Sequence, residues 1–155
     1  SMVEAKAVLA KLGIKSEKEG DLSSEEEREL GKYVETELHH EFVFVTDYPI
    51  DIRPFYHMRH EDNPKLTKSF DLMYKGIEIT TGAQREHRYE KLVEQAKEKG
   101  MNQENIQFYL DFFKFGMPPH GGFGMGPSRL LMKMLGLESI RESMFVFRNP
   151  RRLNP

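Results

Sequence analysis

Two carboxylates, Asp71 and Glu78, lie on the two strands of a predicted β-hairpin and could bind one ion together. The segments KSFDLMY and GIEITT flank Lys75-Gly76, a dipeptide that suits a two-residue turn. With that turn, the predicted register pairs Tyr74 with Ile77, Met73 with Glu78, and Asp71 with Thr80. Because side chains alternate across a strand, Asp71 and Glu78 share one face as diagonal neighbours, with Cα atoms roughly 7–8 Å apart. The opposite face is predicted to point into the core and carries Phe70, Leu72, Ile77 and Ile79.

Two carboxylates on one face repel each other unless a positive charge lies between them. Mg²⁺ is one candidate for that charge, because it is a hard cation that prefers oxygen ligands. A nearby arginine is another, and Arg85 and Arg129 are both candidates. The alternative interpretation is a solvated strand face with ordinary acidic residues.

The segment TTGAQREHRYE follows the hairpin and supplies a second cation. Gln84 and Arg85 are predicted to open a helix directly after the strand. A guanidinium donates a bidentate pair of hydrogen bonds that suits a carboxylate, so Arg85 could hold an acidic small molecule. The alternative is that Arg85 only pairs with Asp71.

A glycine-rich segment, PHGGFGMGPSRLLMKMLG, runs into an apolar helix that carries one arginine, Arg129, which we expect to be buried. Glycines allow the backbone to approach a flat ligand closely, since no Cβ intervenes. An arginine just beyond them could cover a nucleobase or a phosphate. The segment is neither a phosphate-binding loop with a Gly-Lys-Ser/Thr ending nor a dinucleotide fingerprint.

The elements that must position these residues are helices and strands in a mixed order. Apolar spacing, caps and glycine stops predict helices over 3–13, 24–39, 89–100, 102–116 and from Pro127 onward. Ser23 and Glu26 form a predicted capping box at the second of these helices. Strands are predicted at 41–46, which we expect to be buried, at the two arms of the hairpin, and in the glycine-rich segment. The pattern predicts one α+β domain over 1–155, an antiparallel sheet flanked by helices.

Composition narrows the class of protein. The chain has 155 residues, a formal net charge of −2, 38% hydrophobic residues and no cysteine. A net negative charge argues against a nucleic-acid clamp over the whole surface, and the lack of cysteine excludes disulfides and thiolate metal sites. No apolar run reaches membrane-spanning length, so we expect a cytoplasmic protein. His57 and His60 lie in a proline-containing loop and are predicted to be surface histidines.

The segment GGFGMGPSRLLMKMLGLESIRESMFVFRNPRRLNP resembles motif 3 and the C-terminal end of class II aminoacyl-tRNA synthetases, in particular the aspartyl branch of archaeal and eukaryotic type. SFDLMYKGIEITTGAQREHRYEKLVEQ resembles the segment between motifs 2 and 3 of the same family. The resemblance covers nearly the whole chain. It implies a partial class II catalytic fold and an ATP-dependent ligase that joins aspartate to tRNA.

The resemblance also implies roles for individual residues. Arg129 would lie over ATP, above an adenosine site floored by Gly122, Gly124 and Gly126. Asp71 and Glu78 would bind the Mg²⁺ that accompanies the ATP phosphates. Thr81 would supply the hydroxyl that a serine usually supplies in this family. Arg85, with Gln84 beside it, would hold the side-chain carboxylate of aspartate. Arg129 and Glu78 are the residues expected to contribute most to catalysis.

The sequence also departs from the family pattern. Ser128 takes the place of an acidic residue before the motif 3 arginine, and no segment resembles motif 1, which builds the family's dimer interface, or motif 2, which supplies an arginine for the α-phosphate. We therefore expect a part of a catalytic domain with little activity by itself, and the sequence leaves open whether it is a piece, a shortened gene product or a diverged relative. A non-catalytic binding module and a relative of asparagine synthetase remain alternatives. A homodimer is a further expectation, since an exposed sheet edge favours pairing with a second copy.

Overall fold

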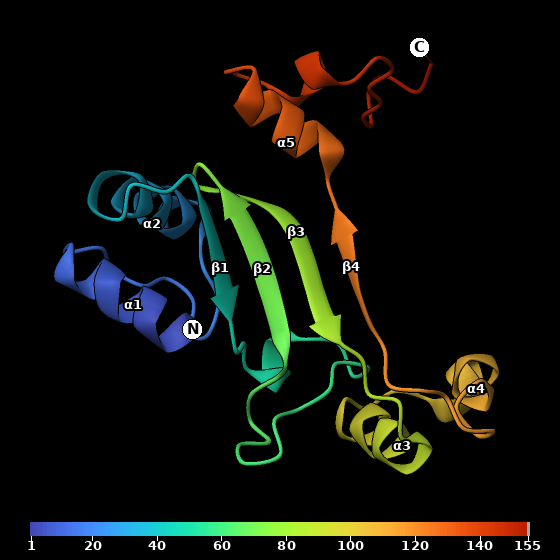
Figure 1. Cartoon of the computed structure of the whole chain (residues 1–155). Helices are drawn as coiled ribbons and strands as arrows, with labels where there is room; N and C mark the ends of the chain where they lie inside the picture. The colour runs from blue at the N-terminus through green and yellow to red at the C-terminus, as the bar shows by residue number, and fades with distance from the viewer. Residues whose placement is uncertain (155) are drawn as a thin grey trace.

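The computed structural model describes residues 1–154 and confirms an α+β fold with one antiparallel sheet (Figure 1). The helices are α1 (Met2–Lys11), α2 (Ser24–Glu37), α3 (Tyr89–Glu98), α4 (Gln103–Asp111) and α5 (Pro127–Met134), with the short 3₁₀ turns η1 (Ile50–Ile52) and η2 (Ile140–Ser143). The strands are β1 (Phe42–Thr46), β2 (Ser69–Tyr74), β3 (Ile77–Gln84) and β4 (Gly121–Met125). The sheet order is β1-β2-β3-β4, with each strand antiparallel to its neighbours.

The hairpin between β2 and β3 turns at Lys75-Gly76, as predicted. Both residues have positive φ, 46° and 73°, which is the geometry of the two-residue turns that match strand twist. Tyr74 pairs with Ile77 and Met73 with Glu78, so the first part of the predicted register is confirmed.

The rest of the hairpin is displaced by a β-bulge. The register shifts between Leu72 and Met73, so that Leu72 pairs with Thr80 and Asp71 with Thr81. The predicted pairing of Asp71 with Thr80 was therefore wrong, because the extra residue Ile79 lies between the two registers. The bulge brings the Thr81 hydroxyl onto the face of the sheet that carries Asp71.

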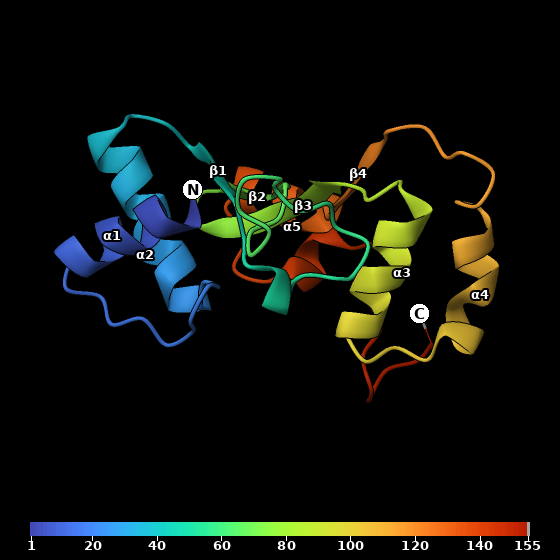
Figure 2. The same cartoon turned by 90° about the horizontal axis from the view of Figure 1, so that it is seen from below.

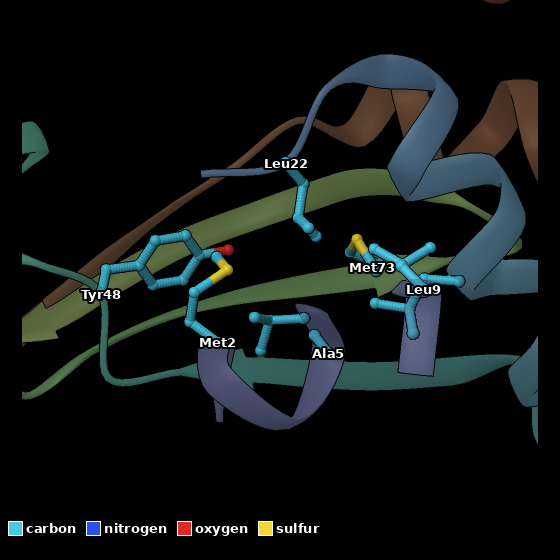
Figure 3. Close-up of a cluster of buried hydrophobic side chains, with 8 residues drawn as sticks. Met2, Ala5, Leu9, Leu22, Tyr48 and Met73 are labelled. Atoms are coloured by element: carbon cyan, nitrogen blue, oxygen red, sulfur yellow. The ribbon is translucent and has the colours of Figure 1, made fainter. Parts of the chain in front are cut away.

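The core lies on that same face, which corrects another prediction. Val45 and Met73 pack with residues of α1 and α2 in one buried cluster, whose members are Met2, Ala5, Leu9, Leu22, Leu30, Val45, Tyr48 and Met73 (Figure 3). Phe70 and Leu72 were predicted to point into the core, but they lie on the opposite face and are only partly buried. Ile79 is buried, as predicted.

The predicted buried strand 41–46 is instead an edge strand. Phe42 and Phe44 on β1 are 50% and 58% exposed, while Val45 is buried. A short apolar run cannot distinguish these cases, because a half-buried strand and a buried strand of aromatic and β-branched residues look alike.

The helices lie around the sheet at separate places. Figures 1 and 2 show α1 and α2 beside β1, whereas α3 and α4 lie together beyond the far ends of β3 and β4. The second buried cluster joins α3 and α4 through Leu92, Ala96, Leu110 and Phe113, with Phe55 from the loop before β2. No helix in the described part of the chain has the length and apolar character that crossing a membrane requires.

Candidate functional site

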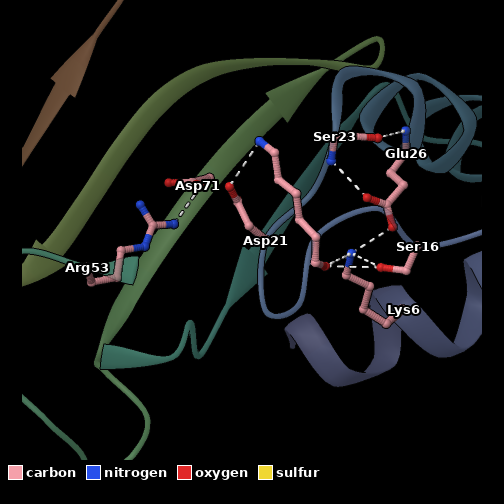
Figure 4. A network of polar contacts seen from close by, with 8 residues as sticks. Lys6, Ser16, Asp21, Ser23, Glu26, Arg53 and Asp71 are labelled. Atoms are coloured by element: carbon pink, nitrogen blue, oxygen red, sulfur yellow. Dashed lines mark hydrogen bonds and ion pairs between the residues drawn. The ribbon is translucent and has the colours of Figure 1, made fainter. Parts of the chain in front are cut away.

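A buried ion pair lies at the centre of the candidate site. The Arg53 guanidinium donates to Asp71 Oδ2 at 2.6 Å (Figure 4). It also donates to Thr81 Oγ1 at 3.2 Å. The Thr81 hydroxyl in turn donates to Asp71 Oδ1. Asp71 is 6% exposed, and both of its carboxylate oxygens are therefore engaged by protein groups.

Arg53 is the residue of this ion pair that the sequence analysis did not identify. It lies in the loop after η1, and its guanidinium carbon is 3.6 Å from the centre of the Tyr48 ring. Burial and the negative charge of Asp71 raise the pKa of Tyr48 above its ordinary range, so the phenol stays neutral beneath the cation. No spacing pattern connects Arg53 with Asp71. The only signal in the sequence was an arginine in the loop that precedes the strand carrying Asp71.

Glu78 and Arg129 form a second, more exposed pair. Arg129 Nη1 donates to the Glu78 backbone carbonyl at 2.9 Å and lies 3.4 Å from its carboxylate. The side chain of Arg129 is 45% exposed, so the expectation that it is buried was wrong. Burial, followed by the negative charge of Asp71, raises the pKa of Glu78, although Arg129 and Arg53 act in the opposite direction. Within residues 1–154, no group of three acidic or histidine side chains could hold a metal ion.

Arg85 lies in a different environment from the one predicted. Gln84 is the last residue of β3 and Arg85 forms a bridge with His57, whereas the helix begins only at Tyr89. The prediction that Gln84 and Arg85 open a helix was therefore wrong. Gln84 is exposed. The bridge holds Arg85 in extended backbone next to the loop that contains His57.

The guanidinium of Arg85 faces a small cavity. It lies 4.8 Å above the centre of the Tyr56 ring, and its Nη1 atom is buried without a hydrogen-bond partner among residues 1–154. The cavity has a volume of about 290 Å³ and is lined by Tyr56, Arg85, Tyr109, His120 and Gly121. The alternative that Arg85 pairs with Asp71 was wrong, since Arg53 takes that carboxylate. A buried donor without a partner suits an anionic or carbonyl group of a ligand.

His57 was predicted to be a surface residue and is instead 5% exposed. Burial, with the nearby charges of Arg85 and Arg53, lowers the pKa of His57 to about 4. The imidazole is therefore neutral at physiological pH. His60 is partly exposed and lies 2.8 Å from Asp47.

The glycine-rich strand β4 completes the site. Gly124 pairs with Thr81 and Gly122 with Ala83, so both glycines lie on the face that carries Asp71. Phe123 pairs with Gly82 and therefore points to the opposite face. A Cβ added to Gly122 would lie 3.6 Å from Arg85 Nη2, and one added to Gly126 would lie 3.5 Å from Arg129 Cδ. The glycines thus leave one face of β4 bare between Arg85 and Arg129.

Three of the predicted site residues lie along one line of the chain. Glu78, Thr81 and Arg85 follow one another on β3 and just beyond it. At about 3.3 Å per residue, Glu78 and Arg85 are roughly 20 Å apart. Arg129 lies beside Glu78 at one end of this line of residues, and Gly122 lies beside Arg85 at the other end. Only an elongated ligand could therefore contact both ends.

Solved structures that superpose on this chain include an aspartyl- and an asparaginyl-tRNA synthetase. The aspartyl-tRNA synthetase of Entamoeba histolytica superposes with a TM-score of 0.94 at 36% identity, over 99% of this chain and 32% of that one. The asparaginyl-tRNA synthetase of Pyrococcus horikoshii, complexed with asparaginyl-adenylate, superposes with a TM-score of 0.88 at 34% identity, over 99% of this chain and 35% of that one.

The family model described as tRNA synthetases class II (D, K and N) matches residues 2–149, and the chain belongs to this family. Among curated relatives, the aspartate–tRNA(Asp/Asn) ligase of Aeropyrum pernix is 53% identical over 94% of this chain. The corresponding ligase of Thermus thermophilus is 50% identical over 87% of it. The chain spans about a third of the length of these relatives, 33% and 32% respectively.

Proposed function

We propose that the 155 residues form part of the adenylate site of an aspartate–tRNA ligase, with ATP, aspartate and tRNA as its substrates. The observation that carries this proposal is the bare glycine face of β4. Gly122 and Gly124 lie on the same face as Asp71 and Thr81, with a cation at each end of the strand pair. The relatives named as aspartate–tRNA ligases support the same assignment.

Each end of the face suits one part of an aspartyl-adenylate. Gly126 and the exposed guanidinium of Arg129 would receive the adenosine and its phosphates. Arg85 would bind the side-chain carboxylate of aspartate, because its buried Nη1 lacks a partner among the described residues. Gln84, at the end of β3, would border the same subsite.

Mg²⁺ fits one of the two predicted carboxylates better than the other. Glu78 is 33% exposed and its only ion pair among residues 1–154 is the 3.4 Å contact with Arg129, so this carboxylate could hold the ion. When bound, Mg²⁺ would neutralise charge on the ATP phosphates. The protein's part is to position aspartate and ATP for in-line attack, which needs no protein nucleophile. Catalysis would then depend on Arg129 and Glu78 as charge partners.

The domain assignment is part of the same proposal. We infer that residues 1–155 belong to one catalytic domain, its C-terminal part, and that the intact ligase works as a homodimer. The chain by itself is expected to bind the adenylate and to react slowly.

A binding and exchange experiment tests the proposal. Isothermal titration with the stable analogue aspartyl-sulfamoyl adenosine should give a measurable affinity. Arg129→Ala should weaken it roughly 10-fold or more, as expected for the loss of a charge-assisted contact. Aspartate-dependent ATP–pyrophosphate exchange, with an intact aspartyl enzyme as positive control, measures the reaction itself. No binding of the analogue by the folded wild-type chain would contradict the proposal and favour a non-catalytic module.

The choice between aspartate and asparagine as the substrate is tested in the same titration. A site that uses Arg85 for recognition should prefer the aspartyl analogue over the asparaginyl analogue, because a guanidinium pairs with a carboxylate better than with an amide. Equal or reversed preference would favour an asparagine-directed relative, as the similarity to an asparaginyl-tRNA synthetase would allow.

A further inference from the structure

A buried glutamine on α3 holds the loop that borders the Arg85 cavity. Gln95 is 4% exposed, and its side-chain amide donates to the Phe55 carbonyl and, at 3.1 Å, to the His57 carbonyl. No other donor within residues 1–154 reaches either carbonyl. Because a buried carbonyl without a donor is costly, Gln95 ties this part of the loop between β1 and β2 to the helix.

The same part of the loop is joined to the end of β3 by backbone hydrogen bonds. The Met58 amide donates to the Gln84 carbonyl at 2.9 Å. The Glu86 amide donates to the Tyr56 carbonyl at the same distance of 2.9 Å. These two bonds lie on either side of Arg85, so the loop and the strand end form a short antiparallel ladder at this residue. The backbone position of Arg85 therefore depends on where the loop lies.

The Tyr56 ring supports the side chain of Arg85. The guanidinium carbon lies 4.8 Å from the centre of this ring, and the buried Nη1 atom has no partner among residues 1–154. A contact between a cation and a ring restrains the guanidinium only while the ring keeps its own place. Tyr56 lies between Phe55 and His57, whose carbonyls both accept from Gln95. The glutamine therefore fixes the backbone on both sides of the ring.

We propose that Gln95 is a positioning residue for the recognition of a carboxylate by Arg85. It holds residues 55–57 so that the Tyr56 ring keeps the guanidinium in the orientation that forms a bidentate pair. Gln95 acts through the loop, since it does not line the cavity beside Arg85. The inference rests on the proposed function for the identity of the ligand, whereas the hydrogen bonds that carry it belong to the protein alone.

Lys99 provides a comparison within the same helix end. It lies four residues after Gln95, and its Nζ donates to the Ile50 carbonyl at 2.6 Å and to the Asp51 carbonyl at 2.8 Å. Both side chains thus hold two carbonyls of one loop, but only Gln95 holds the part that adjoins Arg85. A role of α3 in stability alone would make the two residues equivalent, whereas a positioning role of Gln95 separates them.

The first test compares the affinities of the full chain for aspartyl-sulfamoyl adenosine and for its asparaginyl counterpart. Gln95→Met keeps the length of the side chain but removes both hydrogen bonds. We expect it to bind the aspartyl analogue about 10-fold more weakly and the asparaginyl analogue within about threefold of wild type, because a bidentate pair depends more on orientation than a single hydrogen bond. Lys99→Met should keep the wild-type preference within about twofold.

Two results of this titration would overturn the inference. One is an unchanged preference in folded Gln95→Met, and the other is an equal loss of preference in Gln95→Met and Lys99→Met. If Gln95→Met does not fold, Gln95→Asn takes its place with the same expectation, because its amide is one carbon shorter and cannot reach both carbonyls.

Amide hydrogen exchange without any ligand tests the same arrangement. In Gln95→Met the Met58 and Glu86 amides should exchange at least about 10-fold faster than in wild type, measured relative to the Gly126 amide, which is hydrogen-bonded at the other end of β3. Lys99→Met should leave this ratio unchanged. An unchanged ratio in Gln95→Met would overturn the inference. Failure of the wild-type chain to bind either analogue would instead count against the proposed function, and the exchange rates would still decide whether Gln95 positions the loop at Arg85.

Discussion

Arg53 and Asp71, which are 18 positions apart in the chain, form a buried ion pair at 2.6 Å on the face of the sheet that the glycines of β4 leave bare. The pair decides which predicted carboxylate is accessible. The pair also fixes the loop between β1 and β2, because the Arg53 guanidinium packs on the Tyr48 ring. The loop in turn places Tyr56 and His57 beside Arg85.

The first prediction concerns the selectivity of the Arg85 subsite. Arg85→Lys keeps the positive charge but loses the bidentate geometry, so we expect aspartate analogues to bind roughly 10- to 100-fold more weakly, which corresponds to about 1.5–3 kcal/mol. Titration calorimetry measures this change. Arg28→Lys on the exposed surface of α2 is the matched control and should leave the affinity unchanged. Equal losses in both variants would contradict a role of Arg85 in binding.

The second prediction is a pH dependence of stability that comes from His57. The pKa of His57 is about 4 in the folded chain, below its ordinary value of 6.5, because of burial and the charges of Arg85 and Arg53. The unfolded chain therefore binds more protons between these two pH values. The contribution of neutral His57 is fully present above pH 6.5 and is lost as the pH falls towards 4, by about 3 kcal/mol at most. Asp71, Tyr56 and both arginines surround this group.

Urea unfolding at several pH values between 4.5 and 7 measures this dependence. His57→Gln should flatten the curve relative to wild type, whereas His40→Gln, at an exposed position, should leave its slope unchanged. A His57 resonance that titrates near 6.5 in the folded protein would show that the depression is absent.

The third prediction compares a buried ion pair with an exposed one. Lys6 Nζ lies 2.6 Å from Glu26, which is 1% exposed and also accepts from the Ser23 backbone at 2.8 Å (Figure 4). Lys6→Met leaves that carboxylate buried without its counter-charge, at a cost of about 2–4 kcal/mol in the free energy of unfolding. Lys91→Met breaks a pair of equal type, 2.8 Å long, in which both side chains are more than half exposed. Its expected cost is about 0.5 kcal/mol or less. Similar losses in the two variants would refute the comparison.

The fourth prediction concerns the contact between α2 and the hairpin turn. A Cβ added to Gly31 would lie 2.4 Å from the Gly76 Cα and amide nitrogen, so the helix and the turn would have to separate. Gly31→Ala should therefore destabilise the protein by about 1–3 kcal/mol, even though alanine favours the helix by about 1 kcal/mol. Gly124→Ala is the matched control, because nothing lies within 4 Å of its added Cβ. Thermal unfolding of both variants measures the difference, and a stabilised Gly31→Ala would contradict the packing.

Local sequence determined the elements of this protein. The structure contains the predicted capping box of Ser23 and Glu26, the predicted turn at Lys75-Gly76 and a helix that starts where the range 102–116 was predicted to start. These features depend on a few neighbouring residues, and their hydrogen bonds close within one turn of chain. The motif residues could also be identified from the sequence, because the family resemblance rests on contiguous segments.

Tertiary structure decided which of these residues meet. The bulge at Ile79 moved Thr81 opposite Asp71, a change of one residue that alternation alone cannot foresee. Arg53 reached Asp71 through the packing of a loop on Tyr48, and His57 became buried because the same loop pairs with Arg85. Contacts between residues far apart in sequence depend on how the whole chain closes around its core. The fold therefore determined which charges lie beside Asp71, Glu78 and Arg85. The sequence alone had already indicated that these three residues are candidates for the site.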